Sequence, residues 1–471
     1  MHKLIPHAID AIRDIPDGAT VAIAGFGLAH RFPNELMTAL LDITARDLTI
    51  VCKSWGRFAK DLARLIDEQR VVNLITSLSA RAGEERTPVE DRIAAGEISV
   101  ELVPQGTLVE RLRAGGAGLA GFYTPTGVGT LMAEGKEVRE FDGRAYLFEP
   151  ALRVDYALVR AHRADRSGNL EFRGGSRHFN VSFAKAARVA VAEVDEVVEP
   201  GGLDPERVGL PGVFVTRVVE SRMPVDVPAL IEANRMRKRP PDAPRTYLGK
   251  PALSRSQVAA RAAALLPDGG YVNLGAGIPS LVSDHIGGRD ITLHTENGIL
   301  GYGRVVEGDA IDLDHYTAGS RFVSLRPDAS FFDSVTSFEM VRGGKLDAVV
   351  LGAYQVDSAG NLANWTTPDQ VGGGIGGAMD LAAGDNLVIV CMEHTERTGA
   401  AKLLAACTYP VTGLDCVDTV VTDLAVLVRR DGRFVLTEIA PGFTVEEVVG
   451  LTAMDVTVAD RVAMMTDTIP T

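Results

Sequence analysis

Residues 155–161 read Asp-Tyr-Ala-Leu-Val-Arg-Ala and lead into Asp-Arg-Ser-Gly-Asn-Leu at 165–170. A second stretch repeats this pattern, because residues 347–353 read Asp-Ala-Val-Val-Leu-Gly-Ala and lead into Asp-Ser-Ala-Gly-Asn-Leu at 357–362. Matching positions of the two stretches are 192 residues apart throughout. In each stretch an apolar run precedes a turn signal, as expected of a buried strand that ends in a tight turn. The repeat predicts two related domains that arose by duplication.

A second repeat and a linker place the boundary between these domains. Residues 17–27 contain Asp-Gly, a valine and Gly-Phe-Gly, and residues 268–277 contain Asp-Gly, a valine and Gly-Ala-Gly at nearly the same spacing. Between the halves, residues 235–252 combine basic residues with four prolines, which is typical of a linker because proline cannot donate to a helix or sheet. We therefore predict one domain over residues 1–234 and a second over residues 253–471.

Each half is predicted to be an α/β domain with a mostly parallel sheet. Short apolar runs lie between turn signals, and such runs are typical of strands buried on both faces of a parallel sheet. The runs are Val21–Ala24, Leu48–Val51, Val189–Val194, Ile291–Leu293, Ala348–Leu351 and Leu387–Cys391. Helical patterns at 34–41, 58–68 and 257–266 lie between them. Residues 115–130, rich in glycine, threonine and proline, predict an irregular loop.

The composition is that of a globular protein with an acidic surface. The chain has 471 residues, of which 46% are hydrophobic and 23% are charged, a usual balance for globular domains. Its net charge of -14 repels nucleic acid, so no DNA or RNA partner is predicted. No run of about 18 uncharged apolar residues is present, so no membrane span is predicted.

The cysteines and the first residues bear on the compartment. The four cysteines form no C-x-x-C pair, and we interpret them as reduced thiols without a zinc site. Residues 1–10 lack the charged start and the apolar run of a signal peptide. A cytoplasmic location is therefore expected.

One acidic residue stands at a position that suits chemistry. Residues 291–298 read Ile-Thr-Leu-His-Thr-Glu-Asn-Gly, so Glu296 follows an apolar strand and directly precedes Asn-Gly. Asn-Gly favours a tight turn with positive φ. The carboxylate of Glu296 is then expected at the carboxyl end of a strand, the edge of an α/β sheet where ligands bind.

Glycine-rich stretches are further candidates for ligand contact. Gly25 and Gly27 open one loop and Gly275 and Gly277 open another, but each lacks the last glycine of G-x-G-x-x-G. They predict strand-to-helix turns that present backbone N–H groups, with an anion as one possible partner. Residues 372–377 include five glycines. They are either a surface loop without a role or a backbone that approaches a ligand closely.

Other motifs of nucleophiles and metals are incomplete. Residues 174–178 read Gly-Gly-Ser-Arg-His and lack the final glycine of G-x-S-x-G. No His-Glu-x-x-His is present, and His294 and His394 have no partner at a metal-ligand spacing. No metal site is predicted.

Many segments together resemble family I CoA-transferases, the group of the succinyl-CoA:3-ketoacid and 3-oxoadipate CoA-transferases. Residues 294–301, His-Thr-Glu-Asn-Gly-Ile-Leu-Gly, resemble the catalytic segment, whose hallmark is Ser/Thr-Glu-Asn-Gly. Further likenesses lie at 104–111, 115–127, 165–170, 273–279, 338–344, 360–365, 376–380 and 407–413. The likeness covers nearly the whole chain except the linker, with an α-subunit-like half before it and a β-subunit-like half after it.

The resemblance implies an active site between the two halves. It implies that Glu296 is a covalent nucleophile, and that the Gln105 amide and the Gly377 backbone N–H form an oxyanion hole. Substrate and CoA are expected to contact Gly25, Gly27, Gly275, Gly277, Asn297, Gly298, Gly374 and Gly376. The acyl-CoA is a substrate, so no cofactor is expected, and a homo-oligomer is expected from the family.

The implied chemistry proceeds through covalent intermediates. A glutamate with its ordinary pKa of about 4.3 is ionised at neutral pH and needs no general base. Its carboxylate attacks the thioester of an acyl-CoA such as succinyl-CoA and gives an acyl-glutamyl anhydride. The released CoA thiolate then attacks the glutamyl carbonyl and gives a glutamyl-CoA thioester. An acceptor acid, expected to be a 3-oxoacid, reverses these steps with ping-pong kinetics.

Departures from the family pattern concern the acyl pocket. Residues 25–33 carry an extra residue and bulkier, basic side chains, and Cys-Lys-Ser-Trp-Gly at 52–56 replaces Ser-Asn-Asn-Ala-Gly. His30, Arg31 and Lys53 are candidates to pair with a second carboxylate of the substrate, with solvation of these cations as the alternative. A 3-oxoadipate or other short-chain acid CoA-transferase, an acyl-CoA hydrolase on the same scaffold and a non-catalytic CoA sensor are the alternative functions.

Overall fold

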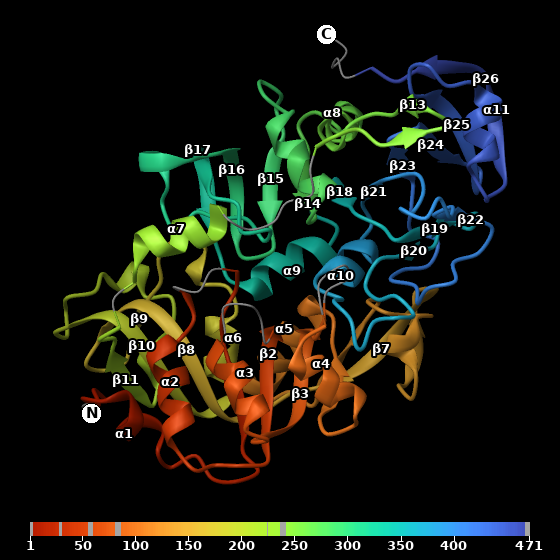
Figure 1. Cartoon of the computed structure of the whole chain (residues 1–471). Coiled ribbons are helices and arrows are strands. Elements are labelled where there is room, and N and C mark those ends of the chain that lie inside the picture. Colours follow the sequence, from red (N-terminus) through yellow and green to blue (C-terminus); the bar gives the residue numbers. More distant parts are fainter. Residues whose placement is uncertain are drawn as a thin grey trace.

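A computed structural model gives the fold of the chain and describes residues 3–27, 31–54, 60–80, 86–223, 225–235 and 242–466. The first half forms the lower lobe in Figure 1 and the second half forms the upper lobe, each built around its own sheet. Helices of both halves lie between the lobes (Figure 1). The predicted α/β fold with two related, mostly parallel domains is confirmed.

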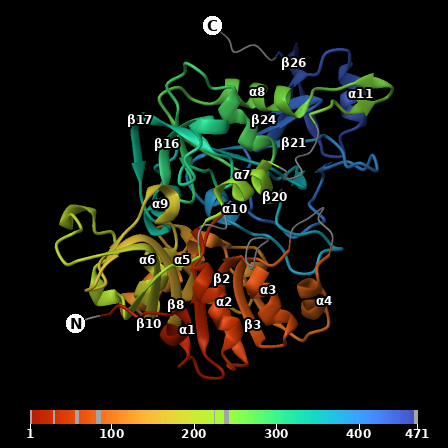
Figure 2. The same cartoon turned by 60° about the vertical axis from the view of Figure 1, so that its left-hand side comes forward.

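The main sheet of the first half is parallel. Its order is β11 (Arg217–Glu220), β10 (Ala187–Val198), β8 (Val154–Asp165), β1 (Thr20–Ile23), β2 (Leu48–Ser54), β3 (Val71–Leu78) and β4 (Ser99–Leu102). Each neighbouring pair in this order runs parallel. Its helices are α1 (Ala8–Ile12), α2 (Asn34–Asp42), α3 (Lys60–Asp67), α4 (Pro88–Ala94), α5 (Gln105–Gly116), α6 (Asn180–Ala186) and α7 (Val227–Arg235). Parallel strands require crossover connections, and Figure 2 shows α2 and α3 standing in front of the sheet.

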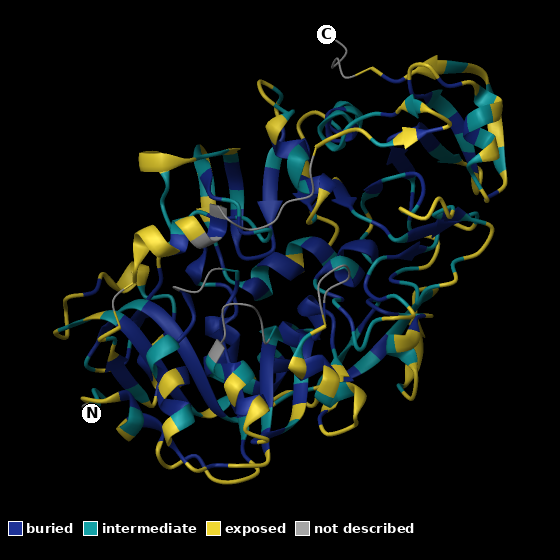
Figure 3. Ribbon diagram, in the orientation of Figure 1, coloured by how far each residue is buried: buried dark blue, intermediate teal, exposed yellow. Residues whose placement is uncertain are grey.

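This sheet separates two cores because successive side chains of a strand point to opposite faces. In β1, Val21 and Ile23 pack with the α1–α3 helices in an outer core. Ala22 and Ala24 face an inner core, which continues into the second half and includes Val272. The buried residues in Figure 3 accordingly run from the lower sheet through the middle of the molecule into the upper sheet. The two halves therefore share a hydrophobic core at their junction.

The main sheet of the second half has a parallel centre and antiparallel flanks. Its order is β17 (Val323–Phe331), β16 (Ile299–Val305), β15 (Thr292–Thr295), β14 (Tyr271–Leu274), β18 (Ala348–Leu351), β21 (Leu387–Met392), β23 (Thr419–Thr422), β24 (Ala425–Arg430), β25 (Arg433–Ile439) and β26 (Val456–Met464). The strands from β15 to β23 pair in parallel. The helices are α8 (Arg255–Leu265), α9 (Ser334–Arg342), α10 (Ala378–Ala382) and α11 (Val445–Gly450).

The two sheets repeat the same strand order. The series β11-β10-β8-β1-β2 corresponds to β23-β21-β18-β14-β15, and in both series the next-to-last strand comes first in the sequence of its main sheet. The repeated turns also agree. The Asp165 carboxylate accepts hydrogen bonds of 2.8–3.0 Å from backbone N–H groups two and four residues ahead and from the Asn169 amide. Asp357 makes the same contacts, with Asn361, at 3.0–3.1 Å. These matches support the predicted duplication.

The predicted elements agree with the structure except in two places. The predicted loop over 115–130 is wrong in part, because α5 continues to Gly116 and β5 (Gly121–Thr124) follows. β5 forms a small antiparallel sheet with β7 (Arg144–Pro150) and β6 (Val138–Phe141).

The predicted linker over residues 235–252 contains some regular structure. In it, α7 ends at Arg235 and a short hairpin joins β12 (Thr246–Tyr247) to β13 (Lys250–Pro251), while 236–241 lie outside the described residues. A smaller sheet holds β20 (Leu362–Ala363), β19 (Gln355–Asp357) and β22 (Leu403–Leu404). In the described part of the chain, no helix is long and apolar enough to cross a bilayer.

Candidate active site

Glu296 lies in the tight turn that joins β15 to β16. Thr295 pairs with Ile299 across the hairpin, and the Gly298 N–H donates a 2.9 Å hydrogen bond to the Thr295 carbonyl. Gly298 has a φ of 102°, and a Cβ at this position would overlap the carbonyl oxygen of Phe332. Only glycine suits this backbone, so the Asn-Gly signal and the strand-end position predicted for Glu296 are correct.

The residues beside Glu296 hold this turn. Asn297 is fully buried, its side-chain oxygen accepts from the Thr295 hydroxyl at 2.8 Å, and its amide donates to the Tyr316 carbonyl at 2.8 Å. His294 is also buried, and burial lowers its pKa to about 3, so the ring is neutral. The ring nitrogens of His294 contact the Asn273 amide at 2.9 Å and the Ser337 hydroxyl at 3.0 Å. These hydrogen bonds give the turn a fixed conformation.

A cavity of about 460 Å³ opens in front of Glu296, between the two halves. The first half contributes Phe26, Lys53, Leu78, Ala80 and Gln105. The second half contributes Glu296, the predicted oxyanion-hole residue Gly377 and the predicted binding glycines Gly275, Gly277, Gly374 and Gly376. Further lining residues of this half include Tyr354, Trp365 and Met392. The predicted placement of the site between the halves agrees with this cavity.

Gly377 lies beside the carboxylate of Glu296, and Gln105 lines the same cavity. A Cβ added at Gly377 would lie 3.0 Å from both Cδ and Oε2 of Glu296, so the Gly377 backbone touches the carboxyl group. Gln105 is 2% exposed, and its side-chain oxygen has no hydrogen-bond partner among the described residues. A buried amide oxygen without a partner is rare in folded proteins.

The glycine-rich loop at 372–377 crosses to the first half. Gly373 accepts from the Ser79 N–H at 2.8 Å and donates its own N–H to the Ser79 hydroxyl at 3.1 Å. Gly376 accepts from the Gln105 N–H at 2.9 Å. The loop is therefore neither a surface loop nor only a ligand contact, because its backbone joins the two halves beside the cavity.

Asp380 fixes the start of α5 from the other half. Its carboxylate accepts from the Gly106 N–H at 2.8 Å and from the Thr126 hydroxyl at 3.2 Å, and it lies 3.6 Å from Arg342. Because Gly106 follows Gln105, this contact fixes the backbone next to Gln105. Sequence reasoning missed the role of Asp380, since nothing in its local sequence shows that it reaches a helix 274 residues away.

The charge state of Glu296 differs from the one expected. Burial raises its pKa to about 7, an effect that the positive charge of Lys53 opposes and the negative charge of Asp380 increases. None of the described residues contributes a hydrogen bond to this pKa. The assumption of an ordinary glutamate, fully ionised at neutral pH, is therefore wrong, because removal of the carboxylate from water disfavours its charge.

Four of the predicted binding residues are not among those that line the cavity. Gly25 packs beneath the ring of Phe32, which would overlap any Cβ there. Gly27 has a φ of 70° and packs against the ring of Tyr316. Asn297 and Gly298 shape the hairpin turn as described above. These residues do not line the cavity; they shape the segments that form its walls.

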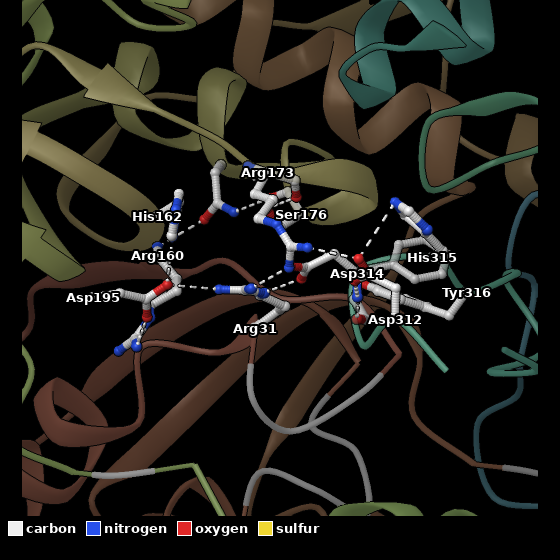
Figure 4. Close-up of polar contacts among 12 residues, drawn as sticks. Arg31, Arg160, His162, Arg173, Ser176, Asp195, Asp312, Asp314, His315 and Tyr316 are labelled. Carbon is white, nitrogen blue, oxygen red and sulfur yellow. Dashed lines mark hydrogen bonds and ion pairs between the residues drawn. The ribbon is translucent and has the colours of Figure 1, made fainter. Parts of the chain in front are cut away.

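The three cations proposed for a second carboxylate have different surroundings. Arg31 is not available, because its guanidinium forms a bidentate pair with Asp314 of the second half and a 3.1 Å contact with Asp195 (Figure 4). Asp314 also accepts from Arg173 at 2.6 Å. Lys53 lines the cavity, whereas His30 lies outside the described residues.

Comparisons with known proteins agree with this architecture. A family model described as coenzyme A transferase matches residues 5–221 and 255–451. The chain is 40% identical over 467 residues to the human protein named succinyl-CoA:3-ketoacid coenzyme A transferase 2, mitochondrial, covering 95% of this chain and 88% of the relative. It is 43% identical over 219 residues to one of the subunits of 3-oxoadipate CoA-transferase from Pseudomonas putida, covering 46% of this chain and 94% of the relative.

A solved structure shows the same fold. The crystal structure of an acyl-CoA transferase from Escherichia coli O157:H7 superposes with a TM-score of 0.78 at 22% identity, and the match covers 99% of this chain and 96% of that chain.

The expected cytoplasmic location is contradicted by the full-length relatives. The human relative and its mouse counterparts are named as mitochondrial proteins. The expectation depended in part on unpaired cysteines, which indicate a reducing environment but do not specify which reducing compartment holds the protein.

Proposed function

This chain belongs to the coenzyme A transferase family, and we propose that Glu296 is the side chain through which it moves CoA from an acyl-CoA to a carboxylic acid. The family resemblance and the predicted enzyme class, a CoA-transferase, are confirmed. The observation that carries the proposal is the buried Glu296 carboxylate in a cavity shared by both halves, with the Gly377 backbone against it.

The first half-reaction transfers CoA to the enzyme. A carboxylate oxygen of Glu296 attacks the thioester carbonyl carbon, the C–S bond breaks, and CoA leaves as a thiolate from an acyl-glutamyl anhydride. The thiolate then attacks the Glu296 Cδ, and the donor acid leaves as a carboxylate. The product is a glutamyl-CoA thioester, in which the energy of the original thioester is kept.

The second half-reaction reverses this order with another acid. The acceptor carboxylate attacks the Glu296 Cδ and releases the CoA thiolate, which then attacks the acceptor acyl carbon of the new anhydride. This step forms the new acyl-CoA and regenerates the Glu296 carboxylate. Carboxylate and thiolate supply every electron pair, so the proposed sequence uses no metal or redox cofactor.

Each tetrahedral intermediate places negative charge on a carbonyl oxygen, which needs donors that are already in position. We assign this role to the Gln105 amide and the Gly377 backbone. The hydrogen bond from Gln105 N–H to Gly376 and the contact of Asp380 with Gly106 support the assignment, because they join the segment that carries Gln105 to the segment that carries Gly377.

We propose succinyl-CoA as donor and a 3-oxoacid as acceptor, because a relative that matches 95% of the chain bears that name. 3-Oxoadipate is the alternative acceptor that a second relative suggests. A homo-oligomer is proposed from the family alone, and light scattering on the purified protein tests it.

The test is a search for the covalent intermediate. The protein is mixed with succinyl-CoA without an acceptor, quenched, digested and analysed by mass spectrometry. We expect CoA on the peptide that contains Glu296, conversion to a hydroxamate by hydroxylamine, and no adduct in Glu296→Gln. Glu393→Gln is the matched control, because Glu393 lines the same cavity but is paired with Arg255.

The absence of an adduct on Glu296 in a folded protein would contradict the proposal. Continuous release of free CoA without any acid would instead favour the hydrolase.

A further inference from the structure

We propose that Arg342 of α9 is a positioning residue of the active site, acting through Asp380 on the two segments that form the oxyanion hole. The inference rests on the proposed function, in which Gln105 and Gly377 stabilise the tetrahedral intermediates. It also gives a role to residues 338–344, a stretch that resembles the family but that the proposed chemistry does not use.

Asp380 is joined to both segments of the oxyanion hole. It lies in the first turn of α10, three residues after Gly377, and in this turn the Leu381 N–H donates to the Gly377 carbonyl at 3.0 Å. The Asp380 carboxylate also accepts from the Gly106 N–H at 2.8 Å, directly after Gln105. A displacement of this carboxylate would therefore shift the start of α5 relative to Gly377.

The guanidinium of Arg342 contacts both Asp380 and α5. Its two terminal nitrogens lie 3.6 Å from the Asp380 carboxylate and 3.7 Å from the carboxylate of Glu110, a residue of α5. A Cβ added at Gly106 would overlap the Asp380 carboxylate and the Arg342 guanidinium. The first turn of α5 thus packs directly on this ion pair, and glycine at position 106 leaves the space that the pair occupies.

The helix that carries Arg342 also supports the nucleophile turn. The Ser337 hydroxyl of α9 contacts the ring of His294 at 3.0 Å, two residues before Glu296. Arg342 ends the same helix five residues later. α9 packs against α5 and α10 in the middle of the molecule (Figure 1). It therefore connects the turn of the nucleophile to the elements of the oxyanion hole.

The charge of Arg342 matters because the carboxylate of Asp380 is fully buried. Burial raises the pKa of Asp380 to about 6, and the positive charge of Arg342 and the hydrogen bond from Gly106 oppose this rise. Burial also raises the pKa of Glu296, against the positive charge of Lys53 and together with the negative charge of Asp380. Without Arg342, the two buried carboxylates would be ionised together only at higher pH. A protonated Asp380 would hold Gly106 more weakly, because a charged acceptor makes the stronger hydrogen bond.

Single-turnover formation of the glutamyl-CoA thioester from succinyl-CoA tests this role, with quenched-flow mass spectrometry as the readout. We expect Arg342→Met to slow this step about 10- to 100-fold at pH 7, the effect of a misplaced catalytic group. The succinyl-CoA concentration that half-saturates the step should change by less than about threefold, because Arg342 does not line the cavity. Arg342→Lys should recover most of the rate, since it keeps the positive charge. Arg113→Met is the matched control and should react like the wild type, because the ion pair of Arg113 is with Glu110 within α5.

The pH profile separates this positioning role from general damage to the fold. In Arg342→Met the pH midpoint of thioester formation should move upward, because Asp380 and Glu296 must ionise without the cation, and high pH should restore part of the rate. Asp380→Asn should move the midpoint downward, because Glu296 loses a negative neighbour. Damage to the fold that does not involve this charge would not produce opposite shifts in the two variants.

A double variant shows whether Arg342 acts through Asp380. Arg342→Met combined with Asp380→Asn leaves no unpaired carboxylate at position 380, so this protein should fold even if Arg342→Met alone does not. It should form the thioester as slowly as Asp380→Asn but no more slowly, because the group through which Arg342 acts is already absent.

Two outcomes would overturn the inference. One is a wild-type rate with an unshifted pH midpoint in folded Arg342→Met. The other is a double variant about tenfold or more slower than Asp380→Asn, which would mean that Arg342 acts independently of Asp380. Failure of the wild type to form the Glu296 adduct would instead contradict the proposed function.

Discussion

Replacement of Glu296 by glutamine is expected to stabilise the protein while abolishing its chemistry. The side chain is 9% exposed, and burial raises its pKa from the usual 4.5 to about 7. The folded state therefore disfavours the ionised carboxylate that catalysis needs. Glutamine has nearly the same shape and carries no charge, so Glu296→Gln removes this unfavourable term and leaves the cavity in place.

The magnitude and the pH window follow from the same values. One pKa unit corresponds to about 1.36 kcal/mol, so the shift from 4.5 to about 7 corresponds to about 3 kcal/mol. Because the pKa of Glu296 is higher in the folded state, protonation of this side chain stabilises the fold. This contribution to the free energy of unfolding is complete below pH 4.5 and is lost as pH rises through 7. The wild type loses this stability across the window, whereas Glu296→Gln does not. The new amide does not ionise, so any effect that it has on the free energy of unfolding is the same at every pH.

The assay compares urea unfolding of both proteins at pH 5 and pH 8. The advantage of Glu296→Gln should grow by about 2–3 kcal/mol from the lower to the higher pH. Glu140→Gln, at an exposed position in β6, is the control and should stay within about 0.5 kcal/mol of the wild type. A difference that is independent of pH would refute the reasoning, because it would mean that Glu296 has an ordinary pKa.

Three further results are expected. Single-turnover formation of the glutamyl-CoA thioester should accelerate about tenfold per pH unit below the pKa of Glu296 and level off above about pH 7, as quenched-flow mass spectrometry measures. Gly377→Ala should slow the same step about 100-fold, because its Cβ would lie 3.0 Å from the Glu296 carboxyl carbon; Gly287→Ala, in open space, should not. Arg31→Met should lower the free energy of unfolding by about 3 kcal/mol, because it removes the bidentate partner of the buried Asp314, and an unchanged urea midpoint would contradict this.

The sequence predicts several central strands of both main sheets and the turn that carries Glu296. Apolar runs and the Asn-Gly signal are local, so their physical meaning does not depend on the rest of the chain. The resemblance supplied Gln105 and Gly377; both line the same cavity as Glu296, and Gly377 lies against its carboxyl group. The duplication, read from two short stretches, also predicted the repeated Asp165 and Asp357 turns.

What sequence reasoning missed depends on contacts between distant parts of the chain. The partner of Arg31 is 283 residues away, so a cation expected in the pocket is used to join the halves. The pKa of Glu296 depends on burial by a second domain and on Lys53 and Asp380. No local pattern records how deeply a side chain is buried or which charges surround it.

The seam formed by Gly373 and Ser79 has a consequence for how the enzyme can be made. Residues of the first half complete the wall of the cavity around Glu296, which belongs to the second half. Neither half by itself is therefore expected to show even weak activity. Two separately synthesised chains would have to be made in equal amounts and to associate in solution. The segment between residues 235 and 252 instead links the halves, and such a link gives one half an effective concentration near the other that is typically in the millimolar range. Fusion thus makes assembly of the catalyst independent of dilution.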